Sequence, residues 1–224
     1  MAVIIDFESR EQLNNYINSN IEDEVLGSGT EGTCYRGKCG KAYKVFSESG
    51  YREFYQIDEI ITQDEVPLRS FAFPETIFTV NGEIEAYSSI LVERNLFDEL
   101  SFSSIIDIDF DKLIEAYKQM LIETKELTSR GIILNDLPNN ILFDGENLVA
   151  VDTCGYERLK SLDENLSSNY AAIDEAIKST FDVLFEDEKS EDIYINRFQD
   201  TILFLRDIES NFKQRSMTKT YVYK

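Results

Sequence analysis

The stretch GIILNDLPNNILFDGENLVAVDT, from Gly131 to Thr153, decides how this chain is interpreted. Asp136 begins a polar loop, and Asn140 closes that loop just before a short apolar segment. A Gly-Glu-Asn turn then leads into a second apolar segment, which ends on Asp152. This pattern predicts a loop followed by a tight β-hairpin. Because a hairpin brings its two ends together, we expect Asn140 and Asp152 to lie near each other.

The side chains of this stretch have the chemistry of a magnesium site beside a base. The amide oxygen of Asn140 and the carboxylate of Asp152 are hard ligands that suit Mg²⁺. Asp136, set slightly apart, is placed to accept a proton from a hydroxyl group or to orient it. Each residue taken alone is more often a loop cap or turn residue. The three together, in this order, favour a catalytic site.

A glycine-rich run, LGSGTEGTCYRG, occupies residues 26–37. A dinucleotide-binding turn would need a helix directly after the glycines. Here the next residues, 33–36, include a β-branched threonine and an aromatic tyrosine and lead into another glycine-rich turn, so we predict a strand–turn–strand hairpin. Such a hairpin can lie over phosphates, because glycines let backbone N–H groups approach closely. An ordinary flexible hairpin is the alternative.

The strand predicted next, AYKVF, carries a lysine on an inward face. Alternation places Ala42 and Lys44 on the same side of this strand. A lysine there is costly unless it finds an anion, which a phosphate group or a helix carboxylate would supply. The helix predicted over 49–62 offers Glu53 and Glu59, and Glu53 is preferred because it borders the apolar stripe.

These motifs, in this order, resemble those of the protein-kinase-like superfamily, reduced to a minimal serine/threonine kinase of the bacterial, eukaryotic-like kind. LGSGTEGTCYRG is similar to the ATP loop, AYKVF to the strand with the phosphate-binding lysine, LNDLPNNILF to the catalytic loop, and VAVDT to the metal-binding strand end. The resemblance covers residues 25–152. It implies an α+β fold of two lobes, the first β-rich with one helix and the second helical and reduced.

The resemblance also implies a role for each residue. Lys44 would hold the α- and β-phosphates of ATP, paired with Glu53, and Asp136 would be the catalytic base. Asn140 and Asp152 would hold Mg²⁺ while the γ-phosphate moves to a hydroxyl group. The other ATP-binding positions would come from the glycine loop, the lysine strand and the hinge between the lobes, namely Gly27, Ser28, Gly29, Thr30, Gly32, Cys34, Ala42 and Glu93.

Departures from the family pattern leave the acceptor and the activity open. The loop has four positions from Asp136 to Asn140 where five are usual, and Leu134-Asn135 replaces His-Arg. Many family members have a lysine two residues after the catalytic aspartate, and none stands there after Asp136. Thr153-Cys154 replaces the usual Phe-Gly. We expect a Ser or Thr hydroxyl of a protein as the acceptor. The alternatives are a small-molecule kinase and a pseudokinase-like module that binds nucleotide or another protein.

Composition narrows the class of protein further. With 22 basic and 43 acidic residues among 224, the net charge is −21, which argues against nucleic acid and anionic membranes as partners. The absence of histidine excludes a histidine base, and the three cysteines lack zinc-site spacing. Free thiols suit a reducing cytoplasm, where we expect the protein, with delivery as an effector as an alternative. We see no signal peptide or membrane span.

The predicted organisation has three parts: an N-terminal helix that packs on the small lobe in 1–20, a first lobe in 21–93 and a second lobe in 94–224. A hairpin turn is predicted at Asn81-Gly82. Helices are predicted at 8–19, 49–62, 110–129, 168–185 and 193–212. Strands are predicted at 21–26, 34–36, 41–46, 70–80, 83–93, 132–134, 141–143 and 148–151.

Overall fold

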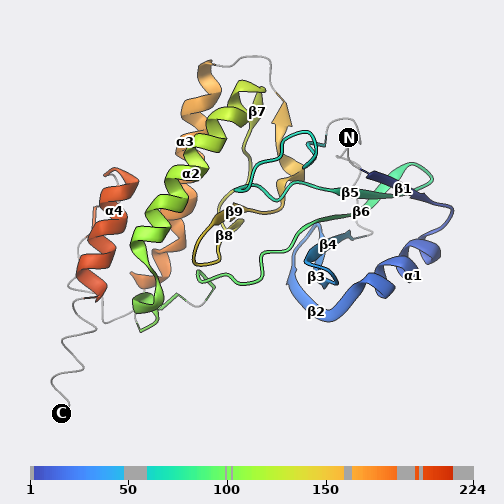
Figure 1. The fold of residues 1–224 in the computed structure, drawn as a ribbon, viewed down its shortest axis with the longest axis horizontal. Helices are drawn as coiled ribbons and strands as arrows, with labels where there is room; N and C mark the ends of the chain where they lie inside the picture. Colours follow the sequence, from blue (N-terminus) through green and yellow to red (C-terminus); the bar gives the residue numbers. More distant parts are fainter. Residues whose placement is uncertain are drawn as a thin grey trace, which may run out of the picture. The chain divides into compact units, whose positions relative to one another are not determined.

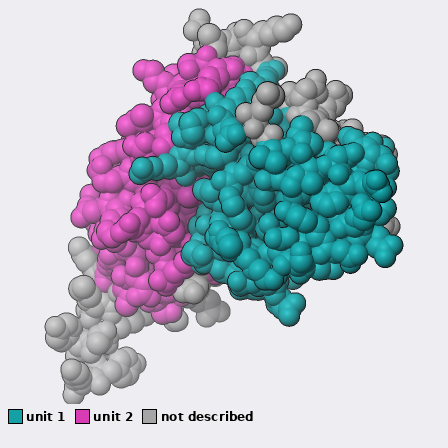
Figure 2. Space-filling model, turned by 45° about the vertical axis from the view of Figure 1, so that its right-hand side comes forward, with its two compact units in different colours: residues 1–93, 151–158 teal, residues 94–150, 159–224 magenta. Residues whose placement is uncertain are grey.

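The structure is a computed structural model, and it describes residues 3–47, 60–98, 100–101, 103–158, 163–185, 195–196 and 199–213. Glu53 and Glu59, with most of the helix predicted over 49–62, lie outside these residues, and 60–62 are not helical. The chain divides into two compact units, 1–93 with 151–158 and 94–150 with 159–224 (Figure 2). The described residues form an α+β protein, as the sequence predicts.

The first unit is built on a six-stranded, mostly antiparallel sheet (Figure 1). Its strands are β1 (Val3–Phe7), β2 (Ile21–Ser28), β3 (Gly32–Gly37), β4 (Lys41–Phe46), β5 (Thr76–Val80) and β6 (Glu83–Ile90). They lie in the order β1-β5-β6-β4-β3-β2. The turn between β5 and β6 consists of Asn81 and Gly82, both with positive φ, which confirms the predicted turn. Three further elements belong to this unit: α1 (Arg10–Asn20), the 3₁₀ turn η3 (Thr153–Gly155) and β10 (Glu157–Arg158).

Strand β1 is absent from the sequence-based prediction. It pairs in parallel with β5, a strand far away along the chain. With only five residues, β1 is too short for the alternation of its side chains to predict a strand. Asp6 fixes its end, because its carboxylate accepts hydrogen bonds from the Thr79 hydroxyl at 2.6 Å and the Gly82 N–H at 3.0 Å. The strand predicted over 70–80 begins only at Thr76, and the apolar residues before it are buried without joining the sheet.

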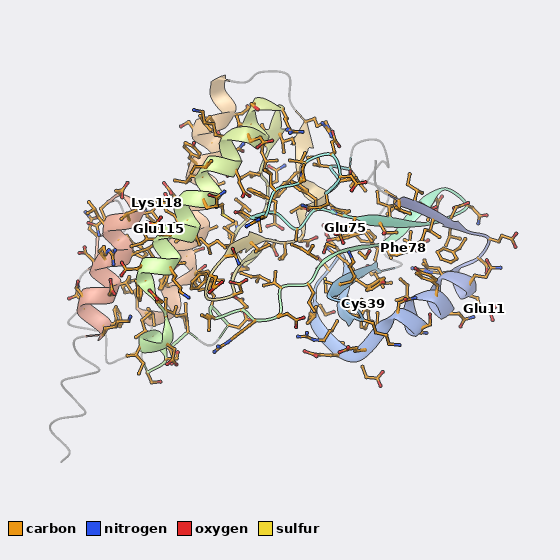
Figure 3. The ribbon with its side chains drawn as sticks, in the orientation of Figure 1. Glu11, Cys39, Glu75, Phe78, Glu115 and Lys118 are labelled. Atoms are coloured by element: carbon orange, nitrogen blue, oxygen red, sulfur yellow. The ribbon has the colours of Figure 1, made fainter. Side chains whose placement is uncertain are left out.

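The sheet buries apolar side chains on both faces. Helix α1, whose first turn is capped by the Ser9 hydroxyl, packs on one face. The cluster there contains Leu13, Ile17, Tyr43, Phe78 and Ala86 (Phe78 is labelled in Figure 3). The cluster on the opposite face contains Phe46, Ile60, Ile77, Ile84, Tyr87 and Cys154. Because Tyr43 belongs to the first cluster, its neighbour Lys44 points to the second face.

The second unit is mainly helical and contains one short hairpin (Figure 1). Its elements are η2 (Ile105–Asp107), α2 (Phe110–Ser129), β7 (Ile132–Ile133), β8 (Ile141–Phe143), β9 (Leu148–Ala150), α3 (Asp163–Thr180), η4 (Asp182–Leu184), α4 (Thr201–Ile208) and the π-helical turn η6 (Glu209–Lys213). Helix α2 has the predicted bounds, and the Asp109 carboxylate caps its N-terminus. β8 and β9 form the predicted antiparallel hairpin.

Two predicted helix starts are wrong. Helix α3 begins at Asp163, five residues before the predicted start. The sequence does not predict these first turns, because the inward positions there are Asn165 and Asn169 rather than apolar residues. Helix α4 begins at Thr201 rather than at 193, and the carboxylate of Asp200 caps it. Within the described part of the chain, no helix is long and apolar enough to cross a membrane.

Candidate functional site

The glycine-rich run forms the antiparallel β2–β3 hairpin, and β3 rather than a helix follows the glycines. This confirms the predicted hairpin and excludes the dinucleotide-binding turn. The Gly29 N–H donates to the Gly32 carbonyl at 2.9 Å, which closes the turn. A β-carbon at Gly32 would lie 2.2 Å from the Val45 carbonyl oxygen, so a larger residue does not fit there.

The remaining loop positions are held by hydrogen bonds within the first unit. Ser28, the last residue of β2, shares a hydroxyl–hydroxyl bond of 3.1 Å with Thr33. The Thr30 carbonyl accepts from the Ser47 hydroxyl at 3.2 Å. Gly27 lies in β2, where a β-carbon would have open space around it. The predicted loop residues therefore form one hairpin, and the end of β4 holds its tip.

Three side chains line up across three strands beside this hairpin. Lys44 on β4 lies opposite Cys34 on β3 and opposite Tyr87 on β6. Directly opposite residues in antiparallel strands share a face, so the three form a row on the face opposite α1. Ala42 lies two residues before Lys44 on the same side, opposite Ser89.

Lys44 is buried among acidic side chains. Its side chain is only 5% exposed, and its Nζ donates to Glu31 Oε2 at 2.8 Å and to both carboxylate oxygens of Asp152. Its Nζ also lies 5.6 Å from the centre of the Phe46 ring. Burial lowers the pKa of this ammonium, but the attraction of Asp152 and Glu31 outweighs burial and raises the pKa above its ordinary value. Lys44 is therefore a charged, buried donor.

Asp152 is held by the first unit at several points. Its backbone is left-handed, with φ 57° and ψ 45°, a conformation that aspartate tolerates better than most residues. The Tyr87 hydroxyl donates to Asp152 Oδ1 at 3.2 Å, and the Thr153 hydroxyl donates to the Ala72 carbonyl at 3.3 Å. Burial raises the pKa of both Tyr87 and Cys154, so both side chains remain neutral.

Glu93 and Cys34, two more of the predicted ATP-binding residues, interact with charged side chains of the first unit. The Glu93 carboxylate forms an ion pair with Arg36 at 2.5 Å, and Arg36 also binds Glu24 at 2.7 Å. Burial raises the pKa of the Cys34 thiol, against the opposing attraction of Lys44. The described partners of Lys44 are Glu31 and Asp152, whereas the predicted partner, Glu53, lies outside the described residues.

The Asp136 loop belongs to the second unit and is closed by its own hydrogen bonds. The Asn140 N–H donates to the Leu137 carbonyl at 2.9 Å, and the Asn140 side-chain amide donates to the Asp136 carbonyl at 2.7 Å. Asp136 and Asn139 both have positive φ, of 54° and 67°. Leu137 is buried, whereas Asp136 is exposed. The four-position spacing therefore gives a compact loop that presents its carboxylate to solvent.

Asn169 is the residue of this unit that the sequence reasoning missed. It is fully buried on α3, and its amide oxygen accepts from the Leu134 N–H at 2.9 Å. Its amide nitrogen donates to the Thr128 hydroxyl at 2.8 Å and to the Ile132 carbonyl at 2.9 Å. One side chain thus joins α2, β7 and the start of the Asp136 loop to α3. An asparagine at an inward helix position was the available signal.

No protein-family model matches the chain, and no curated protein matches it by sequence. Among the described residues, no group of three or more Asp, Glu, Cys or His side chains is arranged to hold a metal ion by itself. A functional proposal therefore has to rest on the chemistry of two groups of residues, the one around Lys44 in the first unit and the Asp136 loop in the second.

Proposed function

We propose that the protein is a reduced, two-lobe kinase-like phosphotransferase, which binds ATP with Mg²⁺ and moves the γ-phosphate to a hydroxyl group. The observation that carries this proposal is the buried ammonium of Lys44, which lies beside the glycine hairpin and contacts the Asp152 carboxylate. A structural lysine is rarely buried to this extent, since lysine reaches solvent easily on its long stem. A cation held here suits an anionic ligand.

The first unit offers what a triphosphate needs. The raised pKa keeps Lys44 positively charged at neutral pH, so it can contact phosphate oxygens. The hairpin beside it has glycines at 27 and 29, where no β-carbon hinders the approach of a ligand to the backbone N–H groups. Cys34 and Ala42 lie on the same face as Lys44 and are small enough to contact a flat base.

The donors assigned to Mg²⁺ are chemically suitable. Both oxygens of Asp152 accept hydrogen bonds from the Lys44 ammonium, so this side chain already contacts a cation. Asn140 uses its amide nitrogen within the loop, and this hydrogen bond leaves its amide oxygen as the candidate ligand. When bound, Mg²⁺ would neutralise charge on the phosphates. The role of Asn140 rests on the order of the motifs in the sequence.

The proposed base is Asp136. Its carboxylate is exposed and belongs to a loop that two internal hydrogen bonds and the buried Leu137 hold in place. A base held in a fixed loop can orient an acceptor hydroxyl and take its proton during transfer. We propose Ser or Thr of a protein as the acceptor, with the hydroxyl of a small molecule as the alternative.

Calorimetric titration with ATP, with and without Mg²⁺, tests the nucleotide site. We expect Mg²⁺-dependent binding to the wild type, weakened at least about tenfold by Lys44→Met, because a charge-assisted hydrogen bond contributes roughly 1.5–3 kcal/mol. Asp152→Asn should remove the Mg²⁺ dependence. Lys118→Met is the matched control, since Lys118 is exposed on α2 and pairs with Glu115 (Figure 3), and it should bind as the wild type does. A wild type that binds no ATP contradicts the proposal.

Phosphate transfer is tested separately with radiolabelled ATP and a mixed protein acceptor such as casein. Asp136→Ala should abolish transfer and spare ATP binding, because its carboxylate is assigned to the acceptor and not to the nucleotide. Unchanged transfer in this variant would show that the base is wrongly assigned.

A further inference from the structure

We propose that Glu31 competes with the phosphates of a nucleotide for Lys44, and so sets the affinity of the site for phosphate-bearing ligands. This inference rests on the proposed function, because it assigns Lys44 to phosphate binding. It gives a role to the one acidic residue of the glycine hairpin tip, a position where the sequence pattern indicates only a turn.

The fold delivers the Glu31 carboxylate to Lys44. Glu31 lies in the turn that the Gly29–Gly32 hydrogen bond closes, directly before β3. Its carbonyl accepts a hydrogen bond from the Ser47 N–H at 2.8 Å. This bond continues the β3–β4 ladder and holds the hairpin tip against the end of β4. The Glu31 side chain then reaches Lys44 Nζ at 2.8 Å while remaining 29% exposed.

The hydrogen-bonding capacity of Lys44 makes the contact competitive. An ammonium group has three donors. One bond goes to Glu31 Oε2 and two go to the oxygens of Asp152, so three acceptors match the three donors. A phosphate oxygen can therefore bind Lys44 only by displacing one of these carboxylate oxygens.

Glu31 is the partner more easily displaced. Asp152 also accepts from the Tyr87 hydroxyl, and the buried residues Thr153 and Cys154 fix the chain directly after it. Glu31 belongs to a hairpin turn between two strands, one of which, β2, is at the edge of the sheet. Turns of this kind open more readily than buried segments do.

Charge strengthens the competition. Glu31 and Asp152 together carry two negative charges against the single positive charge of Lys44, so a bound phosphate would add to an excess of negative charge. Removing the charge of Glu31 leaves Lys44 and Asp152 balanced. If the Glu31 contact leaves Lys44 available about one tenth of the time, the apparent affinity for a phosphate-bearing ligand falls about tenfold.

Calorimetry of the full chain with three ligands tests the inference: ATP with Mg²⁺, ADP with Mg²⁺, and adenosine. Glu31→Gln keeps the shape of the side chain and removes its charge. We expect ATP and ADP to bind this variant about tenfold more tightly than the wild type, with the affinity for adenosine unchanged. Glu31→Ala should give the same gain, which excludes an effect of the new amide. Glu22→Gln is the matched control, since Glu22 is exposed on β2 and its loss changes the net charge equally.

Each outcome has a distinct meaning. Wild-type binding of ATP that is unchanged in both Glu31 variants overturns the competition but leaves the nucleotide site intact. A gain for adenosine equal to the gain for ATP means that the hairpin has merely loosened, which also overturns it. Tighter binding of ATP and ADP by both Glu31 variants, with an unchanged affinity for adenosine, supports the inference. If wild type and variants bind none of the three ligands, the competition and the proposed function are both wrong.

Discussion

Replacing Asn169 by alanine is expected to destabilise the helical unit severely. The side chain is fully buried and makes three hydrogen bonds, two of them to backbone groups next to the Asp136 loop. Alanine removes the acceptor of the Leu134 N–H and the donor to the Ile132 carbonyl. Both groups remain buried in the folded protein, where water does not replace the lost partner.

The magnitude follows from these two groups. A buried polar group left without its partner costs about 1–3 kcal/mol, so two of them cost about 2–6 kcal/mol. Thr128 adds little, because its hydroxyl still donates to the Thr124 carbonyl at 2.8 Å. A total near 4 kcal/mol is a large part of the roughly 5–15 kcal/mol that stabilises an ordinary domain.

Urea unfolding followed by circular dichroism at 222 nm measures this loss. With a slope of about 2 kcal/mol per molar urea, the midpoint should fall by about 2 M. Asn14→Ala is the matched control, since Asn14 is exposed in the middle of α1, and it should change the midpoint by no more than the small difference in helix propensity.

Asn169→Asp separates hydrogen bonding from packing. It keeps the shape and the acceptor for Leu134, but it replaces both donors with a carboxylate oxygen that faces the Ile132 carbonyl. We expect strong destabilisation at neutral pH. A loss below about 1 kcal/mol in both variants, within the range of an ordinary surface substitution, would refute the assignment of Asn169 as the junction of this unit.

Two further predictions concern the first unit. Gly32→Ala should cost about 2–4 kcal/mol, because its β-carbon would meet the β4 backbone, whereas Gly29→Ala has open space and should cost far less; thermal unfolding of the pair measures the difference. The hydrogen bonds from Thr79 and Gly82 lower the pKa of Asp6, so its stabilising effect is present above the ordinary value of about pH 4 and is lost as the pH falls through the lowered pKa. The advantage of the wild type over Asp6→Asn should therefore shrink as the pH falls below about 4, and an advantage that does not change with pH would contradict this assignment.

Local signals in the sequence were sufficient for much of the fold. The α2 helix was predicted with its bounds because a long apolar stripe ends at Arg130-Gly131, and Gly131 has positive φ as a helix stop requires. The Asn81-Gly82 turn and the β2–β3 and β8–β9 hairpins follow from turn chemistry and alternation. Burial of Lys44 follows from alternation alone.

What the sequence did not reveal depends on distant contacts. The start of α3 was missed because Asn165 and Asn169 occupy inward positions that are normally apolar, and the hydrogen-bond partners of Asn169 are far away in the chain. The contact of Glu31 with Lys44 depends on how the hairpin tip bends, which residue spacing does not specify. The roles of Asp136 and Asn140 stay predictions, since the structure gives the shape of their loop and not its chemistry.

The placement of β1 has a consequence for the order of folding. β1 and β2 are consecutive strands, yet they lie at opposite edges of the sheet, with α1 connecting them. The partner of Asp6 is 73 residues further along the chain, so β1 is synthesised before β5 and cannot pair until β5 has been made. The hairpins of β2, β3 and β4 close over short loops and are expected to form earlier. We therefore expect β1 to be the last strand to join the sheet. During folding, a protease should cut the chain at this unpaired edge strand first.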